Sequence, residues 1–286
     1  MAIATGLNHS CALTYENAIY CWGRNTTGGL GNGENDDSDV PVMVEGDREW
    51  KDVSAGYDMS CAIDVDDELW CWGFNNNGQL GNASFSSTNE PVRVSGGHQW
   101  TSVSAGDEYT CGIATDGELY CWGRNDSGQL GIGGEASPTT PDSVDGDGPW
   151  ARVSAGHTHA CAIDIDDELY CWGANGNGRL GDGTTDKRLS PVPVSSDRSW
   201  ASVQPAFDHT CAITTDGELY CWGTNEGGQL GDGTTEPRHE PTAIGDDNSW
   251  QGLAAGLGGH TCAITIDDEL YCWGYNAPCP AGERDR

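Results

Sequence analysis

Twelve of the thirteen cysteines fall into six pairs whose members are ten residues apart. The spacing is Cys-x9-Cys, without the Cys-x2-Cys pairs that zinc ribbons and zinc knuckles use. So many cysteines would be unusual in a reducing compartment unless they bound metal or carried out redox chemistry. The pattern therefore predicts disulfides and an oxidising compartment, either extracellular or at the cell surface. The predicted disulfides are Cys11–Cys21, Cys61–Cys71, Cys111–Cys121, Cys161–Cys171, Cys211–Cys221 and Cys262–Cys272.

Each pair flanks a predicted β-hairpin with a three-residue loop. In the fifth copy the loop is Thr215-Asp216-Gly217, and its last position needs a residue that tolerates the left-handed conformation. Counting outward from the loop places Cys211 opposite Cys221, at a site without ladder hydrogen bonds, where Cα atoms about 4.5 Å apart suit a disulfide. Two buried, reduced cysteines are the alternative. The last loop positions of the six copies are Asn17, Asp67, Gly117, Asp167, Gly217 and Asp268.

The hairpin belongs to a longer unit that recurs six times at a spacing of about fifty residues. A further short strand precedes each hairpin, as in residues 100–106, and a Pro-led strand such as residues 191–194 follows it. Four short strands every fifty residues predict an all-β fold, a β-propeller of six four-stranded blades in a single domain, 1–286. The predicted units are 1–49, 50–99, 100–149, 150–199, 200–249 and 250–276, followed by a C-terminal tail, 277–286.

The sixth unit departs from the repeat soon after Gly274, where its Pro-led strand is missing. Three outcomes stay open: a ring closed by packing of its end blades, an open arc, or an arc that recruits a partner. The odd cysteine, Cys279, stands where the other copies have glycine, and an unpaired cysteine in a secreted chain suggests intermolecular pairing. We expect self-association or docking through the terminal blades, with Cys279 near that contact. The alternative is a monomeric ring with Cys279 in a frayed tail.

Residues 204–231 and 154–181 show a characteristic run. It reads Ser-Ala-Gly-x-x-His-Thr-Cys-Ala-Ile, then Leu-Tyr-Cys-Trp-Gly-x-Asn-x-x-Gly-Gln-Leu-Gly, with small departures. The run resembles the repeat of the regulator of chromosome condensation family, and most closely its cysteine-containing bacterial or archaeal members. The resemblance covers residues 1–276 and implies a β-propeller. Members of that family commonly have seven blades, whereas this chain holds six hairpins.

The net charge is −32, and lysine occurs only twice. Nucleic acid is disfavoured as a partner, because binding phosphates requires clustered Lys and Arg. A solvated acidic surface is the simplest interpretation, and the composition suits a halophilic, high-salt habitat. No stretch approaches the roughly 20 apolar residues of a membrane span, and no signal peptide is expected ahead of the first repeat.

Two sets of potential metal ligands recur with the repeat. Histidine stands two residues before the first cysteine in four copies, but Met59 and Tyr109 occupy that position in the others, so we predict hydrogen bonds to neighbouring backbone rather than metal binding. The acidic hairpin turns offer oxygen ligands to calcium, although no glycine-pivoted calcium loop is present. The histidines are His9, His159, His209 and His260, and the calcium candidates are Asp66, Asp67, Asp166, Asp167, Asp267 and Asp268.

Catalytic motifs are missing from the sequence. It contains no Gly-x-Ser-x-Gly elbow and no phosphate-binding Gly-x4-Gly-Lys, and we expect no catalytic residue and no cofactor. The first hypothesis is a non-enzymatic module that binds protein or itself, through variable loops expected around one face of the ring, at 82–90, 132–149 and 232–248. The second is a secreted polysaccharide-directed enzyme or lectin with a site at the central channel, since two of the 45 acidic residues can converge there.

Overall fold

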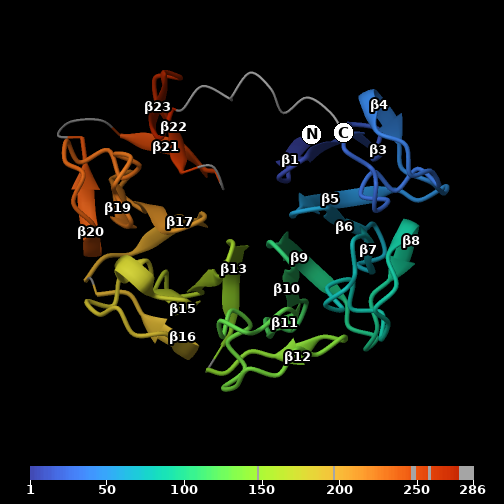
Figure 1. The fold of residues 1–286 in the computed structure, drawn as a ribbon, viewed down its shortest axis with the longest axis horizontal. Helices are drawn as coiled ribbons and strands as arrows, with labels where there is room; N and C mark the ends of the chain where they lie inside the picture. Colours follow the sequence, from blue (N-terminus) through green and yellow to red (C-terminus); the bar gives the residue numbers. More distant parts are fainter. Residues whose placement is uncertain (147, 196, 246–248, 257–258, 277–286) are drawn as a thin grey trace.

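The computed structural model describes residues 1–146, 148–195, 197–245, 249–256 and 259–276. Six small antiparallel sheets surround a central channel like the blades of a propeller (Figure 1). The helical structure within these residues is a single 3-10 turn, η1 (Gly176–Gly178). The predicted all-β propeller of six repeats is therefore confirmed. Cys279 and the rest of the predicted tail lie outside the described residues.

The blades follow one another along the chain, and we number them 1 to 6. Blade 1 consists of β1 (Ala2–Thr5), β2 (His9–Leu13), β3 (Ile19–Gly23) and β4 (Ser38–Met43). Blade 2 consists of β5 (Trp50–Ala55), β6 (Met59–Asp64), β7 (Leu69–Gly73) and β8 (Thr88–Arg93). Blade 3 consists of β9 (Trp100–Ala105), β10 (Tyr109–Ala114), β11 (Leu119–Gly123) and β12 (Asp142–Ser143).

Blades 4 to 6 repeat this order. Blade 4 consists of β13 (Trp150–Ala155), β14 (His159–Asp164), β15 (Leu169–Gly173) and β16 (Arg188–Pro193). Blade 5 consists of β17 (Trp200–Pro205), β18 (His209–Thr214), β19 (Leu219–Gly223) and β20 (Arg238–Ile244). Blade 6 consists of β21 (Trp250–Ala255), β22 (His260–Thr265) and β23 (Leu270–Gly274), and among the described residues it has no fourth strand. The expectation of four-stranded blades is thus met in blades 1 to 5 only.

The hairpin of each blade has the predicted register. Cys11 pairs with Cys21 in the β2–β3 ladder, and the other five pairs align in the same way. The Thr14 N–H donates to the carbonyl of Ala18 (2.9 Å), so alternation puts the cysteines at a site without ladder bonds. Cα–Cα distances of 4.0 to 4.1 Å accompany all six disulfides. The predicted disulfides are present.

The core of the protein lies between blades rather than within them. Each blade has a front face, formed by its cysteines and the leucine or isoleucine residues that alternate with them, and a back face formed by valine, alanine and tryptophan. In the first interface, Cys11, Ile19 and Leu30 on the front of blade 1 pack against Trp50 and Trp72 of blade 2. The same combination recurs at the next four interfaces. One blade therefore cannot bury its apolar front face without the following blade.

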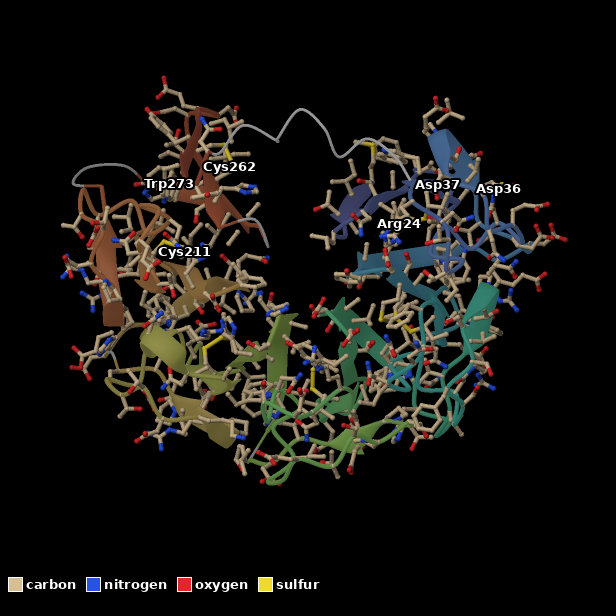
Figure 2. The ribbon with its side chains drawn as sticks, viewed as in Figure 1. Arg24, Asp36, Asp37, Cys211, Cys262 and Trp273 are labelled. Atoms are coloured by element: carbon tan, nitrogen blue, oxygen red, sulfur yellow. A yellow bond between two sulfur atoms is a disulfide. The ribbon has the colours of Figure 1, made fainter. Side chains whose placement is uncertain are left out.

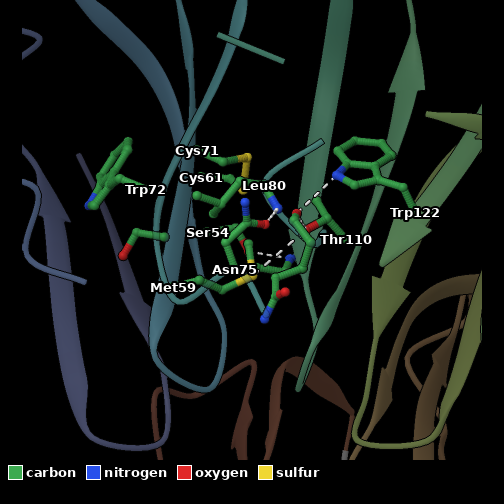
Figure 3. Close-up of a disulfide and its surroundings, with 12 residues drawn as sticks. Ser54, Met59, Cys61, Cys71, Trp72, Asn75, Leu80, Thr110 and Trp122 are labelled. Carbon is green, nitrogen blue, oxygen red and sulfur yellow. Dashed lines mark hydrogen bonds between the residues drawn. A yellow bond between two sulfur atoms is a disulfide. The ribbon is translucent and has the colours of Figure 1, made fainter. Parts of the chain in front are cut away.

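Hydrogen bonds reinforce each interface, as the contact between blades 2 and 3 illustrates (Figure 3). The indole N–H of Trp122 in blade 3 donates to the carbonyl of Gln79 in blade 2 (2.9 Å). The hydroxyl of Thr110 donates to the same carbonyl (2.8 Å). These bonds hold blade 3 over the buried disulfide Cys61–Cys71.

The six blades form an open arc rather than a closed ring. Figure 1 shows a gap between blade 6 and blade 1, and Figure 2 places Cys262 and Trp273 at one end of the arc and Arg24 at the other. On the back of blade 1, the Ile3 side chain is 69% exposed, whereas the equivalent Val53 in blade 2 is 8% exposed. Of the three outcomes left open by the sequence, the structure shows the open arc.

The inner strands approach one another closely at the end of each Ser-Ala-Gly-like segment, where five blades have glycine and blade 5 has Ala206. A Cβ atom added to Gly56 would lie 2.3 Å from the carbonyl oxygen of Gly106 in the next blade. That carbonyl accepts a hydrogen bond from the N–H of Tyr57 (3.3 Å). The Ser-Ala-Gly segment thus lets neighbouring blades bond through their backbones.

Replacing Gly56 by Ala should therefore lower the free energy of unfolding, by about 1–3 kcal/mol, because the added methyl group forces two blades apart. The matched control is Gly134→Ala, where a Cβ meets nothing within 4 Å, and its effect should stay within about 0.5 kcal/mol. Chemical denaturation of the three proteins gives both values. Equal stability of the Gly56→Ala and Gly134→Ala proteins would contradict this account of the interface.

Candidate functional site

The propeller has two rims, each formed by a different set of loops. The N–H of Arg24 donates to the carbonyl of Asn8 (2.9 Å), which joins the loop after β3 to the turn before β2 on one rim. We call this rim the channel-mouth face. The N–H of Trp50 donates to the carbonyl of Asn17 (2.8 Å), which joins the hairpin turn to the start of the next blade on the other rim, the hairpin face. Each blade repeats this division.

The channel itself is lined mainly by small side chains of the inner strands. Its cavity has a volume of about 740 Å³ and is surrounded by the Val-Ser-Ala-Gly segments of successive blades. Serine hydroxyls tie these strands together, since Ser54 accepts from the N–H of Ala105 (3.0 Å) and Ser104 from that of Ala155 (2.9 Å). Asp107 is the sole carboxylate among the described residues that line the cavity.

Different side chains occupy the same turn position around the channel mouth. Directly after the glycine or alanine that ends each Ser-Ala-Gly-like segment stand, from blade 2 to blade 5, Tyr57, Asp107, His157 and Phe207. The His157 ring stacks on Phe207, with ring centroids 4.2 Å apart, and its Nε2 lies 3.2 Å from the Asp107 carboxylate. Asp107 is buried, whereas Phe207 is 41% exposed. Three neighbouring blades thus build one mixed aromatic and polar surface.

Arg124 extends this surface outward from blade 3. It donates from Nε and Nη2 to both carboxylate oxygens of Asp126 (2.7 and 2.9 Å) and from Nη1 to Glu108 (3.1 Å). The hydrogen bond from Arg124 lowers the pKa of Asp126, whereas partial burial raises the pKa of Glu108. A fixed guanidinium flanked by carboxylates is a polar contact suited to peptide groups and charged side chains.

Arg179 ties blades 4 and 5 together at the same rim. It replaces the glutamine found at positions 79, 129 and 229, and its side chain is buried. It pairs with Asp208 (2.5 Å) and donates to the hydroxyl of Thr158 (3.2 Å) and to the carbonyl of Phe207 (3.4 Å). Burial lowers the pKa of Arg179. The pairing with Phe207 and Asp208 fixes the turn that carries the exposed aromatic ring.

Three of the four recurrent histidines, His9, His159 and His209, lie in the blade interfaces, whereas His260 on blade 6 is exposed. The Nε2 atoms of His9, His159 and His209 lie 2.7 to 2.8 Å from a hydroxyl of the following blade. For His209 this hydroxyl belongs to Thr261, which donates its own hydrogen to the carbonyl of Gln229 (2.9 Å), so Nε2 carries the hydrogen of the first bond. The predicted bonding to neighbouring backbone is therefore wrong in detail, because the hydroxyl stands between ring and backbone.

The proposed calcium ligands lie in the hairpin turns. The Asp64 carboxylate accepts the N–H groups of Asp66 (3.0 Å) and Glu68 (2.9 Å), and Asp67 pairs with Lys51. No group of three or more potential metal-ligating side chains occurs in the described part of the chain. The calcium prediction has no further support and stays untested.

The variable segments do not all lie on one rim as expected. Residues 88–90 belong to β8, residues 238–244 to β20 and residues 142–143 to β12. The N–H of Ile165, in the hairpin turn of blade 4, donates to the carbonyl of Pro149 (3.3 Å). The end of segment 132–149 therefore lies on the hairpin face. The parts of these segments that precede β8, β12 and β20 belong to the channel-mouth face, because they continue the loop after the third strand. The sequence analysis missed the channel-mouth turn residues Tyr57, Asp107, His157 and Phe207. Their variation between two nearly constant stretches, Ser-Ala-Gly and His-Thr-Cys, is the signal that could have identified them.

The comparisons with known proteins agree with this geometry. A family model described as the RCC1-like domain matches residues 1–286. Human WBSCR16 is 22% identical, with a TM-score of 0.81 over 90% of this chain and 70% of that one. Prp20p of Saccharomyces cerevisiae is 21% identical, with a TM-score of 0.83 over 96% of this chain and 71% of that one.

A third similar structure comes from a plant. The CRINKLY WD40 ectodomain of the receptor kinase ACR4 from Arabidopsis thaliana is 21% identical, with a TM-score of 0.61 over 97% of this chain and 80% of that one. At these identities the similarity shows the fold alone. A search of the curated proteins finds no match.

The buried histidines make stability depend on pH. Burial lowers the pKa of His9 and of His209 to about 4, below the unfolded value of 6.5. As the pH falls, the unfolded chain therefore binds these protons before the folded protein does. The contribution of the neutral histidines to the free energy of unfolding is fully present above pH 6.5. It falls by roughly 3 kcal/mol per histidine as the pH drops toward 4. In His209→Met, which copies the Met59–Thr110 contact of blades 2 and 3, melting temperature should fall less steeply across this range. If the melting temperature of the variant fell with pH as steeply as that of the unsubstituted protein, the lowered pKa of His209 would be contradicted.

Proposed function

Because the chain belongs to the RCC1-like domain family, we propose that it is a non-enzymatic, extracellular module that binds a protein partner on the channel-mouth face. The single observation that carries the proposal is the pattern of variation on that face. Tyr57, Asp107, His157 and Phe207 occupy one turn position in successive blades, while the flanking strands repeat almost unchanged. Variation at one turn position between constant strands is typical of a recognition site.

The chemistry of this face suits a polypeptide partner. The exposed Phe207 ring is held by the stacked His157 and by the turn that Arg179 fixes. Rigid aromatic side chains and arginines contribute most strongly to protein interfaces, because they bury a large area at little conformational cost. Arg124 and its carboxylate partners add polar contacts at the rim of such a patch.

The location outside a reducing compartment rests on the disulfides. Six intrachain disulfides suit an oxidising environment. The ACR4 structure is that of a receptor ectodomain, so a similar fold occurs on the outside of a cell. Across the described ranges, no helix has the length and apolar character to cross a membrane. The binding properties of Prp20p toward Gsp1p and histones give a precedent for protein binding by this fold.

A glycoside-cleaving site in the channel has less support. Retaining and inverting glycosidases use two carboxyl groups that flank the scissile bond. Of the described residues that line the cavity, only Asp107 carries one, and it is engaged by His157. The lining also lacks the exposed aromatic platforms on which sugar rings usually stack, within the same described residues. Protein binding is therefore the function that the site supports best.

Photocrosslinking tests this proposal although the partner is unidentified. Replacing Phe207 by p-benzoylphenylalanine keeps an aromatic side chain on the channel-mouth face, and the matched control carries the same group at Ile165, which is 61% exposed in a hairpin turn on the opposite face. After irradiation in the extracellular fraction of the source cells, we expect a protein adduct of discrete mass from position 207 and none from position 165.

Two results would contradict the proposal. The first is a crosslinking result that does not distinguish the two faces: either the same protein adducts form from positions 207 and 165, or no adduct forms from either position. The other is release of reducing sugar ends from extracellular polysaccharide by the purified protein, with loss of this release in Asp107→Asn. The second result would favour the channel site instead.

A further inference from the structure

The front face of blade 6 is uncovered, unlike every other front face. Leu270 is 66% exposed and Ile264 is 39% exposed, whereas their equivalents in blade 5, Leu219 and Ile213, are 1% and 4% exposed. Cys272 is exposed as well, although the half-cystines of the other five disulfides are fully buried. The exposed face thus consists of side chains that are core residues in five other copies.

The outer edge of blade 6, strand β23, is also unpaired within the described ranges. β23 has the sequence Leu-Tyr-Cys-Trp-Gly, which β11, β15 and β19 share. In those blades the edge pairs with a fourth strand, and in blade 4 the N–H of Val194 donates to the carbonyl of Leu169 (2.9 Å). Among the described residues no strand pairs with the Leu270 carbonyl or with the outward N–H and C=O groups of Cys272. An unpaired edge of this kind is a template for an added strand.

The repeat itself defines which strand fits this edge. The fourth strands of blades 1, 2, 4 and 5 have proline followed by valine or threonine, one further residue, and a valine or isoleucine that is buried in the interface. In blade 4, Val192 lies opposite Cys171, and a register shift next to Cys171 leaves room for Pro191, which has no N–H to donate. Val194 then packs in the cluster of Cys171, Leu169 and Ile163.

We propose that blade 6 binds an extended segment of another polypeptide with the pattern Pro-Val-x-Val, which adds to β23 as an antiparallel fourth strand. Its first valine lies opposite Cys272, and its second packs against Leu270 and Ile264. Backbone bonds supply affinity and the two valines supply selectivity, as in other cases of strand addition. This surface is separate from the channel-mouth face, so the proposal is independent of the function proposed above.

A second copy of the chain cannot continue the ring from blade 6. The blades follow one another around the channel, and blade 1 lies directly across the gap from blade 6 (Figure 1). If blade 1 of a second copy packed on blade 6, its blade 2 would fall where blade 1 of the first copy already lies. The Pro-led strands of a second copy are also paired inside its own blades. We therefore assign the segment to a partner chain that presents it unpaired.

A peptide with the sequence of residues 187–195, Lys-Arg-Leu-Ser-Pro-Val-Pro-Val-Ser, tests the proposal with the full-length protein. Labelled with fluorescein, it should bind saturably and slow backbone hydrogen exchange in β23. The control peptide carries aspartate in place of both valines and should bind at least about tenfold more weakly, because each valine loses its apolar contact.

Matched protein variants locate the site. Leu270→Arg alters the uncovered face and should weaken peptide binding at least about tenfold, whereas Ile165→Arg, at a similarly exposed position in blade 4, should leave it unchanged. Equal binding of the two peptides, or equal binding by the two variants, would overturn the proposal. So would a dimer in sedimentation experiments with β23 already protected from exchange before peptide is added, because a second copy would then occupy the edge.

Discussion

The contact between the front face of one blade and the back face of the next is the interaction on which the whole structure depends. Each blade is too small to bury its own apolar side chains, so its disulfide, leucine and isoleucine residues stay exposed until the next blade covers them. Tryptophan from the following blade fills this space and bonds back to the preceding loop, as Trp72 does to the carbonyl of Gly29 (3.0 Å). Stability therefore builds up interface by interface along the chain.

This dependence explains both surfaces for which we propose roles. Where interfaces are complete, the turns at the channel mouth are held rigidly enough to vary in sequence without loss of the fold, and Phe207 and Asp107 occupy such turns. Where the series of interfaces ends, core residues such as Leu270 remain exposed at the surface. The channel-mouth face thus depends on complete interfaces between blades, whereas the exposed front face of blade 6 exists because no further blade covers it among the described residues.

Much of the fold was predictable because the period and the cysteine spacing report local geometry. The loop requirement at Asn17 and its equivalents fixes the hairpin register, and the register fixes the disulfides. Contacts between distant positions were harder to predict. The hydroxyl partner of His209 lies about fifty residues away in the next blade, and the surface made by Asp107, His157 and Phe207 exists only because three turns meet at one rim. A single unit of sequence does not encode such neighbours.

The central claim is that five interfaces are complete and the sixth front face is bare. Its most direct test is the order in which the disulfides of the folded protein react with a limiting amount of reductant, followed by alkylation and peptide mapping. Cys262–Cys272, with Cys272 exposed, should be labelled well before the five disulfides whose cysteines are fully buried. Simultaneous labelling of all six, or labelling of Cys262–Cys272 last, would contradict the account.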